Sequence, residues 1–199
     1  MFHIIDDFYS SPEKLLQLSD SCLNTGCGSG IKSDDISLLD AELYSNLKNS
    51  LFSQYNIDHN KHHLTTYLTK HTYDPNFTGR IHIDGRNPHS YGITKSNYNL
   101  VLCGMLFLTP VLDSNSGISF YNVKDSVWTK EEEFNVTLND CYTYNKEQLE
   151  EYHSNFYETL SVKNVQNRFV CWTAGSKHKN NMTKKQHTRV VQNFYISLV

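Results

Sequence analysis

The feature that most constrains this fold is a change of hydrophobic period near residue 64. Before it, apolar residues recur at helical spacing in two stretches, one following the Ser-Ser-Pro at 10–12 and one over 40–55, while 24–33 is expected to be a loop. After it, segments rich in β-branched and aromatic residues alternate with turn residues, as strands do. Strands are predicted over 2–8, 64–70, 78–84, 98–109, 118–121, 167–172 and 188–198, and one later helix over 146–160. This order predicts a mainly β protein with flanking helices, either an antiparallel sandwich or a double-stranded β-helix (jelly roll).

Length and composition fit one globular domain. The chain has 199 residues without a linker-like stretch or an internal repeat, so residues 1–199 are expected to form a single domain. Hydrophobic residues make up 38% and charged residues 20%, which argues against a disordered chain. The net charge of −3 provides no basic field for nucleic acid, and no apolar run reaches the length of a membrane span, so neither partner is expected.

The cysteines indicate the compartment. There are five, an odd number, and they are widely scattered behind an N-terminus without a signal-peptide pattern. Free thiols in a reducing, cytoplasmic environment are therefore expected. Cys22 and Cys27 are the only near pair, and no second close pair completes a zinc site.

The stretch that carries chemistry is Arg-Ile-His-Ile-Asp-Gly at 80–85. On a strand, residues two apart point the same way, so His82 and Asp84 are expected to share a face. An imidazole beside a carboxylate is two thirds of the two-histidine, one-carboxylate arrangement that binds non-haem iron(II). The tripeptide alone is weak, because a surface strand with two solvated polar residues has the same pattern.

A second histidine should come from a late strand, because a jelly roll brings early and late strands together. His178 follows a short turn where its side chain can lean over the barrel mouth, and it is preferred over its competitor His187. Downstream, Arg189 can bind a cosubstrate carboxylate through two parallel charge-assisted hydrogen bonds. Asn193 and Tyr195 share the strand face of Arg189 and could line the same cavity.

Taken in order, these residues resemble a known family. The H-x-D motif, the apolar run at 104–109 followed by Ser-Gly-Ile-Ser-Phe-Tyr at 116–121, Asn-Arg-Phe-Val at 167–170, His178 and Arg189 are similar to the 2-oxoglutarate- and iron(II)-dependent dioxygenases. The nearest branch looks like the prolyl-hydroxylase-like one, including members from phages and marine bacteria. Ser-Gly stands at 116–117 where the family often has Gly-Gly, a mild departure.

The resemblance implies a mechanism and a set of roles. His82, Asp84 and His178 would be the catalytic metal ligands for Fe(II), and Arg189 would bind 2-oxoglutarate, with Tyr67 as a further hydrogen-bond partner of that cosubstrate. The implied reaction uses O2 to hydroxylate a substrate C–H bond and releases succinate and CO2. The substrate, a small molecule or a peptide side chain, is not indicated by any motif.

Other interpretations remain open at this point. A jelly-roll module that binds metal or a ligand without catalysis, or a structural phage protein that kept the fold, would have the same pattern. The histidines at 59, 62, 63 and 71 lie in a polar stretch and are expected to face solvent. The loops 85–97 and 124–145 are expected to flank the mouth of the site, and the lysines at 177, 179, 184 and 185 are interpreted as a solvated loop.

Overall fold

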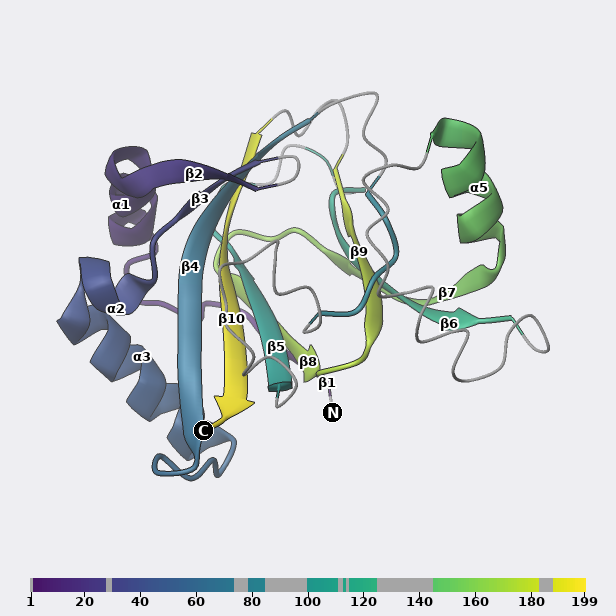
Figure 1. Ribbon diagram of the computed structural model, residues 1–199. Coiled ribbons are helices and arrows are strands. Elements are labelled where there is room, and N and C mark those ends of the chain that lie inside the picture. Colours follow the sequence, from purple (N-terminus) through teal and green to yellow (C-terminus); the bar gives the residue numbers. More distant parts are fainter. Residues whose placement is uncertain are drawn as a thin grey trace.

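Two antiparallel sheets face each other in the computed structural model (Figure 1). It describes residues 2–27, 30–73, 79–84, 100–110, 113, 115–124, 145–182 and 188–199. The major sheet has the strand order β1-β8-β5-β10-β4-β3-β2, and the minor sheet has the order β7-β6-β9. The expected double-stranded β-helix is confirmed, because two sheets enclose one interior and helices lie outside it.

The element bounds are as follows. The major sheet contains β1 (Phe2–Ile5), β2 (Leu23–Cys27), β3 (Gly30–Ser33), β4 (His62–Thr72), β5 (Leu100–Phe107), β8 (Arg168–Thr173) and β10 (Thr188–Leu198). The minor sheet contains β6 (Gly117–Val123), β7 (Phe156–Lys163) and β9 (Lys177–Asn181). The described helices are α1 (Glu13–Cys22), α2 (Ile36–Leu39), α3 (Ala41–Gln54) and α5 (Lys146–Ser154). No helix in these parts of the chain is long and apolar enough to cross a membrane.

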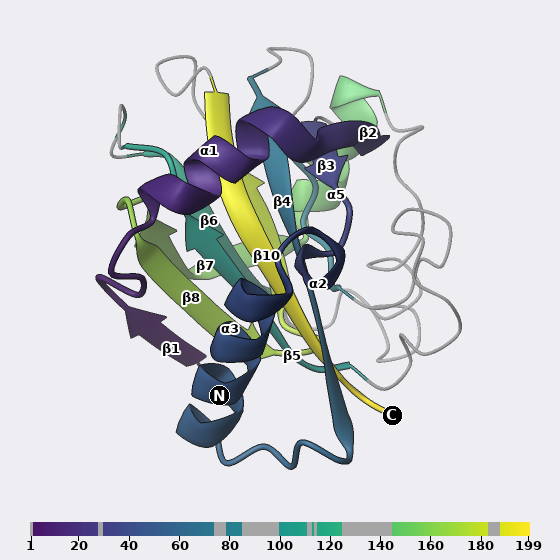
Figure 2. The ribbon, with the colours of Figure 1, turned by 90° about the vertical axis from the view of Figure 1, so that its left-hand side faces the viewer.

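The first three helices cover the outer face of the major sheet (Figure 2). Asp40 caps α3 by accepting a hydrogen bond from the Leu43 backbone N–H at 2.9 Å, which fixes where the helix begins. The helices and the sheet share one apolar cluster, in which Leu51 and Phe52 of α3 join Phe194 of β10. The apolar side of each helix and the outer face of the major sheet are buried against each other. The removal of both apolar surfaces from water stabilises the position of the helices.

The central strand β10 separates the two faces of the major sheet. It pairs with β4 along its whole length and with β5 on its other side. Phe194 and Ile196 point toward the helices, whereas Val191 belongs to a second apolar cluster between the two sheets. This alternation confirms the expected strand over 188–198 and turns Arg189 and Tyr195 toward the interior.

Two expected elements are wrong in this structure. The helix expected over 146–160 ends at Ser154, where Asn155 caps it with hydrogen bonds from its side-chain amide to the Glu151 and Tyr152 carbonyls. The residues from Phe156 onward form β7 instead. The loop expected over 24–33 is the β2–β3 hairpin, which extends the sheet edge by pairing with β4.

Two further expectations hold only in part. The strand expected over 78–84 is reduced, within its described residues, to one isolated β-bridge at His82. The turn expected over 173–178 is shorter, since β9 already begins at Lys177. Both differences have the same origin, because the 79–84 segment lies against β9 and the bridge joins them.

Candidate metal centre

A β-bridge brings His82 and His178 side by side. Each backbone N–H donates to the other residue's carbonyl at 2.9 Å, and the ring centroids lie 4.4 Å apart. Ile83 stands between the two predicted ligands of the H-x-D motif, and Ile81 directly precedes His82. Ile81 is buried against α5, where the Tyr152 hydroxyl donates to the Ile81 carbonyl at 2.7 Å. The helix therefore anchors the segment that carries His82.

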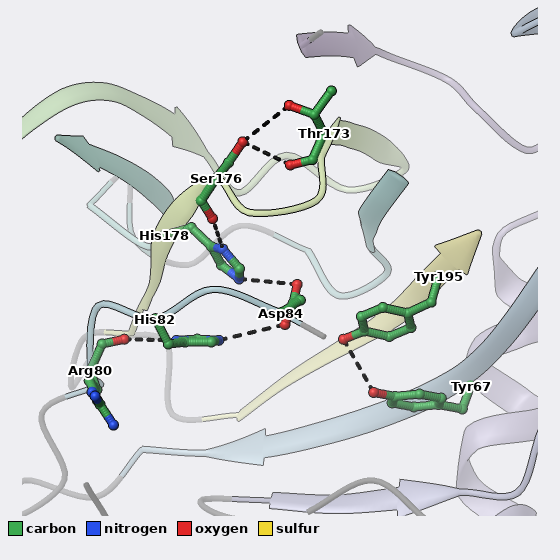
Figure 3. A network of polar contacts seen from close by, with 8 residues as sticks. All are labelled: Tyr67, Arg80, His82, Asp84, Thr173, Ser176, His178 and Tyr195. Atoms are coloured by element: carbon green, nitrogen blue, oxygen red, sulfur yellow. Dashed lines mark hydrogen bonds and ion pairs between the residues drawn. The ribbon is translucent and has the colours of Figure 1, made fainter. Parts of the chain in front are cut away.

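The Asp84 carboxylate completes the group (Figure 3). Its Oδ1 lies 3.8 Å from Nε2 of His82, and its Oδ2 lies 3.4 Å from Nε2 of His178. The candidate ligand atoms of the three residues all lie within 4.8 Å of one another. The structure thus brings together the three residues that the sequence predicted as metal ligands.

Backbone carbonyls orient both imidazole rings. Nδ1 of His82 lies 3.0 Å from the Arg80 carbonyl oxygen, and Nδ1 of His178 lies 3.0 Å from the Ser176 carbonyl oxygen. A carbonyl oxygen can only accept, so each Nδ1 carries a proton, and in a neutral ring Nε2 is then the nitrogen with a free lone pair. Ligand histidines are held in this way by a hydrogen bond at the second ring nitrogen.

Electrostatics favour the neutral imidazole that a metal requires. Burial lowers the pKa of His82 to about 4, and the neighbouring His178 lowers it further while Asp84 acts in the opposite direction. His82 is therefore uncharged at neutral pH, and no proton competes with a cation for its Nε2. Two imidazole nitrogens and one carboxylate are the donor set of the facial triad, so the residues present fit a divalent metal such as iron(II).

Arg189 lies on the facing sheet and is completely buried. Its Nη1 donates to the carbonyls of Gly117 and Asn181, at 3.0 and 3.1 Å, while Nε and Nη2 have no partner among the described residues. Burial lowers the pKa of Arg189 to about 10, so it stays protonated at neutral pH. A buried cation with idle donors is costly unless an anion meets it. Gly117 is required here, since a Cβ would collide with the Val162 carbonyl.

Similar solved structures include proteins with 2-oxoglutarate bound and a member of the 2OG-Fe(II) oxygenase family. No protein-family model and no curated relative matches the sequence. The chain is similar to HygX from Streptomyces hygroscopicus with nickel and 2-oxoglutarate bound, at a TM-score of 0.60 and 12% identity over 98% of this chain and 82% of that one. It is also similar to the Trichoplax adhaerens prolyl hydroxylase in complex with a hypoxia inducible factor peptide fragment, at a TM-score of 0.59 and 12% identity over 98% and 83% of the two chains.

The chain has the fold of the 2-oxoglutarate- and iron(II)-dependent oxygenases. A third similar structure is SnoN, a non-heme alpha-ketoglutarate-dependent epimerase from nogalamycin biosynthesis, at a TM-score of 0.59 and 10% identity over 98% of this chain and 78% of that one. HygX has also been crystallised with hygromycin B. Because these proteins differ in what they bind, the shared oxygenase fold does not name a substrate for this chain.

The other predicted site residues line the inner face of the major sheet. The Tyr67 hydroxyl donates to the Tyr195 hydroxyl at 3.3 Å, and the two rings stack with centroids 5.7 Å apart. The Asn193 amide donates to Thr69 Oγ1 at 2.9 Å. Asn193 and Tyr195 share one polar wall, as the strand alternation of 188–198 predicted, and Tyr67 of β4 belongs to the same wall.

Two residues of this wall were missed by the sequence. His71 was expected to face solvent. This prediction is wrong, because His71 lies opposite Arg189 in the β4–β10 register. Burial and then Arg189 lower the pKa of His71 to about 3. Lys32, in the expected loop, places its Nζ 4.6 Å from the centroid of the Tyr67 ring. Extending the 64–70 alternation by one residue was the signal that could have found His71.

The remaining expectations concern surface residues. His59 and His63 are exposed as predicted, whereas His62 is half-buried. Lys179 is not on a solvated loop, since it lies on β9 with Nζ 5.8 Å from the Tyr121 ring centroid, and burial lowers its pKa. His187, the lysines at 184 and 185, the loop 85–97 and nearly all of 124–145 lie outside the described residues.

Proposed function

We propose that this protein is a 2-oxoglutarate- and Fe(II)-dependent dioxygenase that uses O2 to hydroxylate a C–H bond of its substrate, with release of succinate and CO2. The observation that carries the proposal is the pairing of two features in one interior. One is the His-Asp-His cluster, in which both Nε2 atoms face the Asp84 carboxylate. The other is a buried guanidinium with idle donors on the facing sheet.

His82, Asp84 and His178 would hold the metal through two Nε2 atoms and one carboxylate oxygen. Three protein ligands on one side of an ion leave positions open for a chelating cosubstrate and for oxygen. When bound, iron(II) supplies the oxygen activation that couples 2-oxoglutarate decarboxylation to substrate oxidation. The protein's contribution is to present the three ligand atoms in fixed orientations, through the hydrogen bonds at each Nδ1 and the α5 anchor on Ile81.

Arg189 would bind the far carboxylate of 2-oxoglutarate with Nε and Nη2, which point to a bidentate pair. The Asn181 carbonyl that accepts from Arg189 lies on β9, the strand that carries His178, so one strand connects the guanidinium with the candidate metal ligands. Tyr67 would donate a hydrogen bond to the same cosubstrate from the polar wall.

Apolar side chains between the sheets would keep water from the reacting centre. Trp172 and Phe120 pack beside His178, with ring centroids 4.9 and 6.1 Å from its imidazole. Both are buried in the cluster between the two sheets. Such a wall strengthens the electrostatic contacts inside and limits side reactions.

The test is iron-dependent turnover of 2-oxoglutarate without added substrate, measured as succinate by chromatography. Wild-type protein should release succinate slowly when iron(II), ascorbate and oxygen are present, and Asp84→Ala should not. Asp58→Ala is the matched control, since Asp58 is an exposed carboxylate paired with Lys61 and should not affect turnover. Metal binding without any succinate would favour the non-catalytic jelly-roll alternative.

Three broader expectations belong to the same proposal. Residues 1–199 would form one oxygenase domain, which is supported by the presence of β1 and β10 in a single sheet. A cytoplasmic location is supported by the free, buried thiols of Cys103 and Cys171. Membership of the prolyl-hydroxylase-like branch with its phage and marine bacterial members stays a prediction from sequence resemblance.

A further inference from the structure

Asn164 carries a buried amide that makes no hydrogen bond within the described chain. It directly follows β7 and is completely buried, yet neither Oδ1 nor Nδ2 of its side chain has a partner among the described residues. Most buried polar groups in proteins are paired, because an unpaired one loses its hydrogen bonds to water without replacement. The Asn164 amide is therefore a candidate for binding a ligand.

The backbone places Asn164 at the end of the interior that contains Arg189. The Asn164 N–H donates to the Ser116 carbonyl at 2.8 Å, which extends the β6–β7 ladder by one pair. The next residue, Gly117, accepts from Arg189 Nη1 at 3.0 Å. Ladder residues two apart share a face, so Asn164 is on the face of Val162, which packs in the cluster between the sheets. Asn164 thus faces the interior beside the segment that binds the guanidinium.

Arg189 and Asn164 together offer more donors than acceptors. Nε and Nη2 of Arg189 and Nδ2 of Asn164 can donate, whereas Oδ1 of Asn164 is the single acceptor among these four unpaired atoms. Water donates as readily as it accepts, but an ionised carboxylate only accepts and has about four lone-pair sites. Because a guanidinium is always protonated, the ligand that best fits this set of donors is a carboxylate.

We propose that Asn164 is a second binding residue for the far carboxylate of 2-oxoglutarate, to which its Nδ2 donates beside the two donors of Arg189. The proposal rests on the cosubstrate site of the proposed function and adds a residue to it. Arg189 supplies the charge, and the neutral amide of Asn164 supplies a further directional donor. The carboxylate would then be bound from both sheets, since Arg189 lies on β10 and Asn164 follows β7.

The test measures 2-oxoglutarate binding to nickel-loaded protein by isothermal titration, with Asn164→Leu and Asn164→Asp as variants. Leucine resembles asparagine in shape but has no donor, so the Kd should rise about 10- to 100-fold for the loss of one hydrogen bond to a charged group. Aspartate should raise the Kd further, because its carboxylate repels the cosubstrate and competes with it for Arg189. Nickel affinity should equal that of wild type in both variants.

Thermal unfolding of the metal-free proteins separates a binding role from a structural one. Replacing an unpaired buried amide with an apolar side chain of similar shape should leave the melting temperature of Asn164→Leu unchanged or raise it. A structural amide would give the opposite result, since its loss removes hydrogen bonds that the folded chain makes.

Asn167→Gly is the matched control. Asn167 is a second buried amide in the connection between β7 and β8, but it accepts from the Tyr9 N–H at 2.9 Å and donates to the Tyr9 carbonyl at 2.7 Å. Glycine readily adopts its φ of 63°, so the variant loses only the side-chain hydrogen bonds. It should melt at a lower temperature than wild type and bind 2-oxoglutarate with unchanged Kd.

Either of two results would overturn the role of Asn164. One is wild-type affinity for 2-oxoglutarate in Asn164→Leu or Asn164→Asp. The other is a fall in the melting temperature of Asn164→Leu as large as that of Asn167→Gly. Failure of the proposed function is distinguishable from both, because folded wild-type protein would then bind no 2-oxoglutarate in the presence of nickel.

Discussion

Replacing Arg189 with glutamine should weaken 2-oxoglutarate binding strongly and leave metal binding intact. The guanidinium is completely buried, and Nε and Nη2 are the donors left for an anion. A hydrogen bond to a charged group contributes about 1.5–3 kcal/mol, so two of them amount to about 3–6 kcal/mol. At 1.4 kcal/mol per factor of ten, the Kd should rise by about 10² to 10⁴.

The assay is isothermal titration of 2-oxoglutarate into nickel-loaded protein, since nickel occupies such a site without turnover. Arg168→Gln is the matched control. Arg168 also lies on a strand of the major sheet, but it pairs with Asp6 at the surface, with N···O distances of 2.6 and 2.8 Å. Its removal should leave the Kd for 2-oxoglutarate unchanged. Nickel affinity should equal that of wild type in both variants, because neither touches the His-Asp-His cluster.

The Gly117 and Asn181 carbonyls lose a donor in Arg189→Gln, so the fold must be checked separately. Arg189→Lys serves this purpose, because it keeps a buried cation but replaces the two-pronged donor with a point charge. An intermediate Kd is expected for it. The reasoning is refuted if Arg189→Gln melts like wild type and binds 2-oxoglutarate with wild-type affinity.

Three other outcomes are expected. Asp84→Ala should weaken cobalt(II) binding more than about 100-fold in an absorption titration. This loss exceeds the one expected for residues that only hydrogen-bond to a metal ligand. Wild-type affinity in the variant would exclude Asp84 as a ligand. Burial and Arg189 lower the pKa of His71 to about 3. Between about pH 6.5 and pH 3, His71 therefore binds a proton in the unfolded chain but not in the folded protein. The free energy of unfolding should fall as the pH is lowered through this range. Urea denaturation should show a shallower fall in His71→Gln, and equal slopes would contradict this. Tyr152→Phe loses the bond to the Ile81 carbonyl and should cost about 1–2 kcal/mol in the same assay, with weaker cobalt(II) binding, whereas an unchanged denaturation midpoint would argue against the anchor.

The sequence pattern predicted the secondary structure correctly where a single hydrophobic periodicity dominates a segment. The strand over 188–198 has the same bounds in the sequence prediction and in the structure. Its alternate side chains pack into two different apolar clusters, one on each face of the sheet. The nearly continuous apolar run at 98–109 indicated a strand buried on both sides, and β5 is buried in this way from Leu102 to Phe107. The helix expected over 40–55 is α3, shorter by one residue at each end.

The sequence pattern predicted the wrong secondary structure where pairing with another strand decides the local conformation. Phe156 stands at helical spacing from Leu149 and Tyr152, and all three are buried together, yet the helix ends before Phe156. The chain there gains more by pairing β7 with β6 along seven positions. The β2–β3 hairpin likewise exists because β4 offers an unpaired edge, and a glycine-rich stretch gives no periodic sign of this.

The sequence by itself supplied the types of the ligand residues, the order of strands and the presence of an arginine for a carboxylate. Only the tertiary structure decided that the imidazoles of His82 and His178 meet through a β-bridge, with their Nδ1 protons held by carbonyls. It alone placed Cys103 between Tyr195 and Trp172 in the sheet and His71 opposite Arg189. The physical reason is that periodicity along a chain fixes which face a side chain takes, whereas its neighbours on that face come from strands paired across long stretches of sequence.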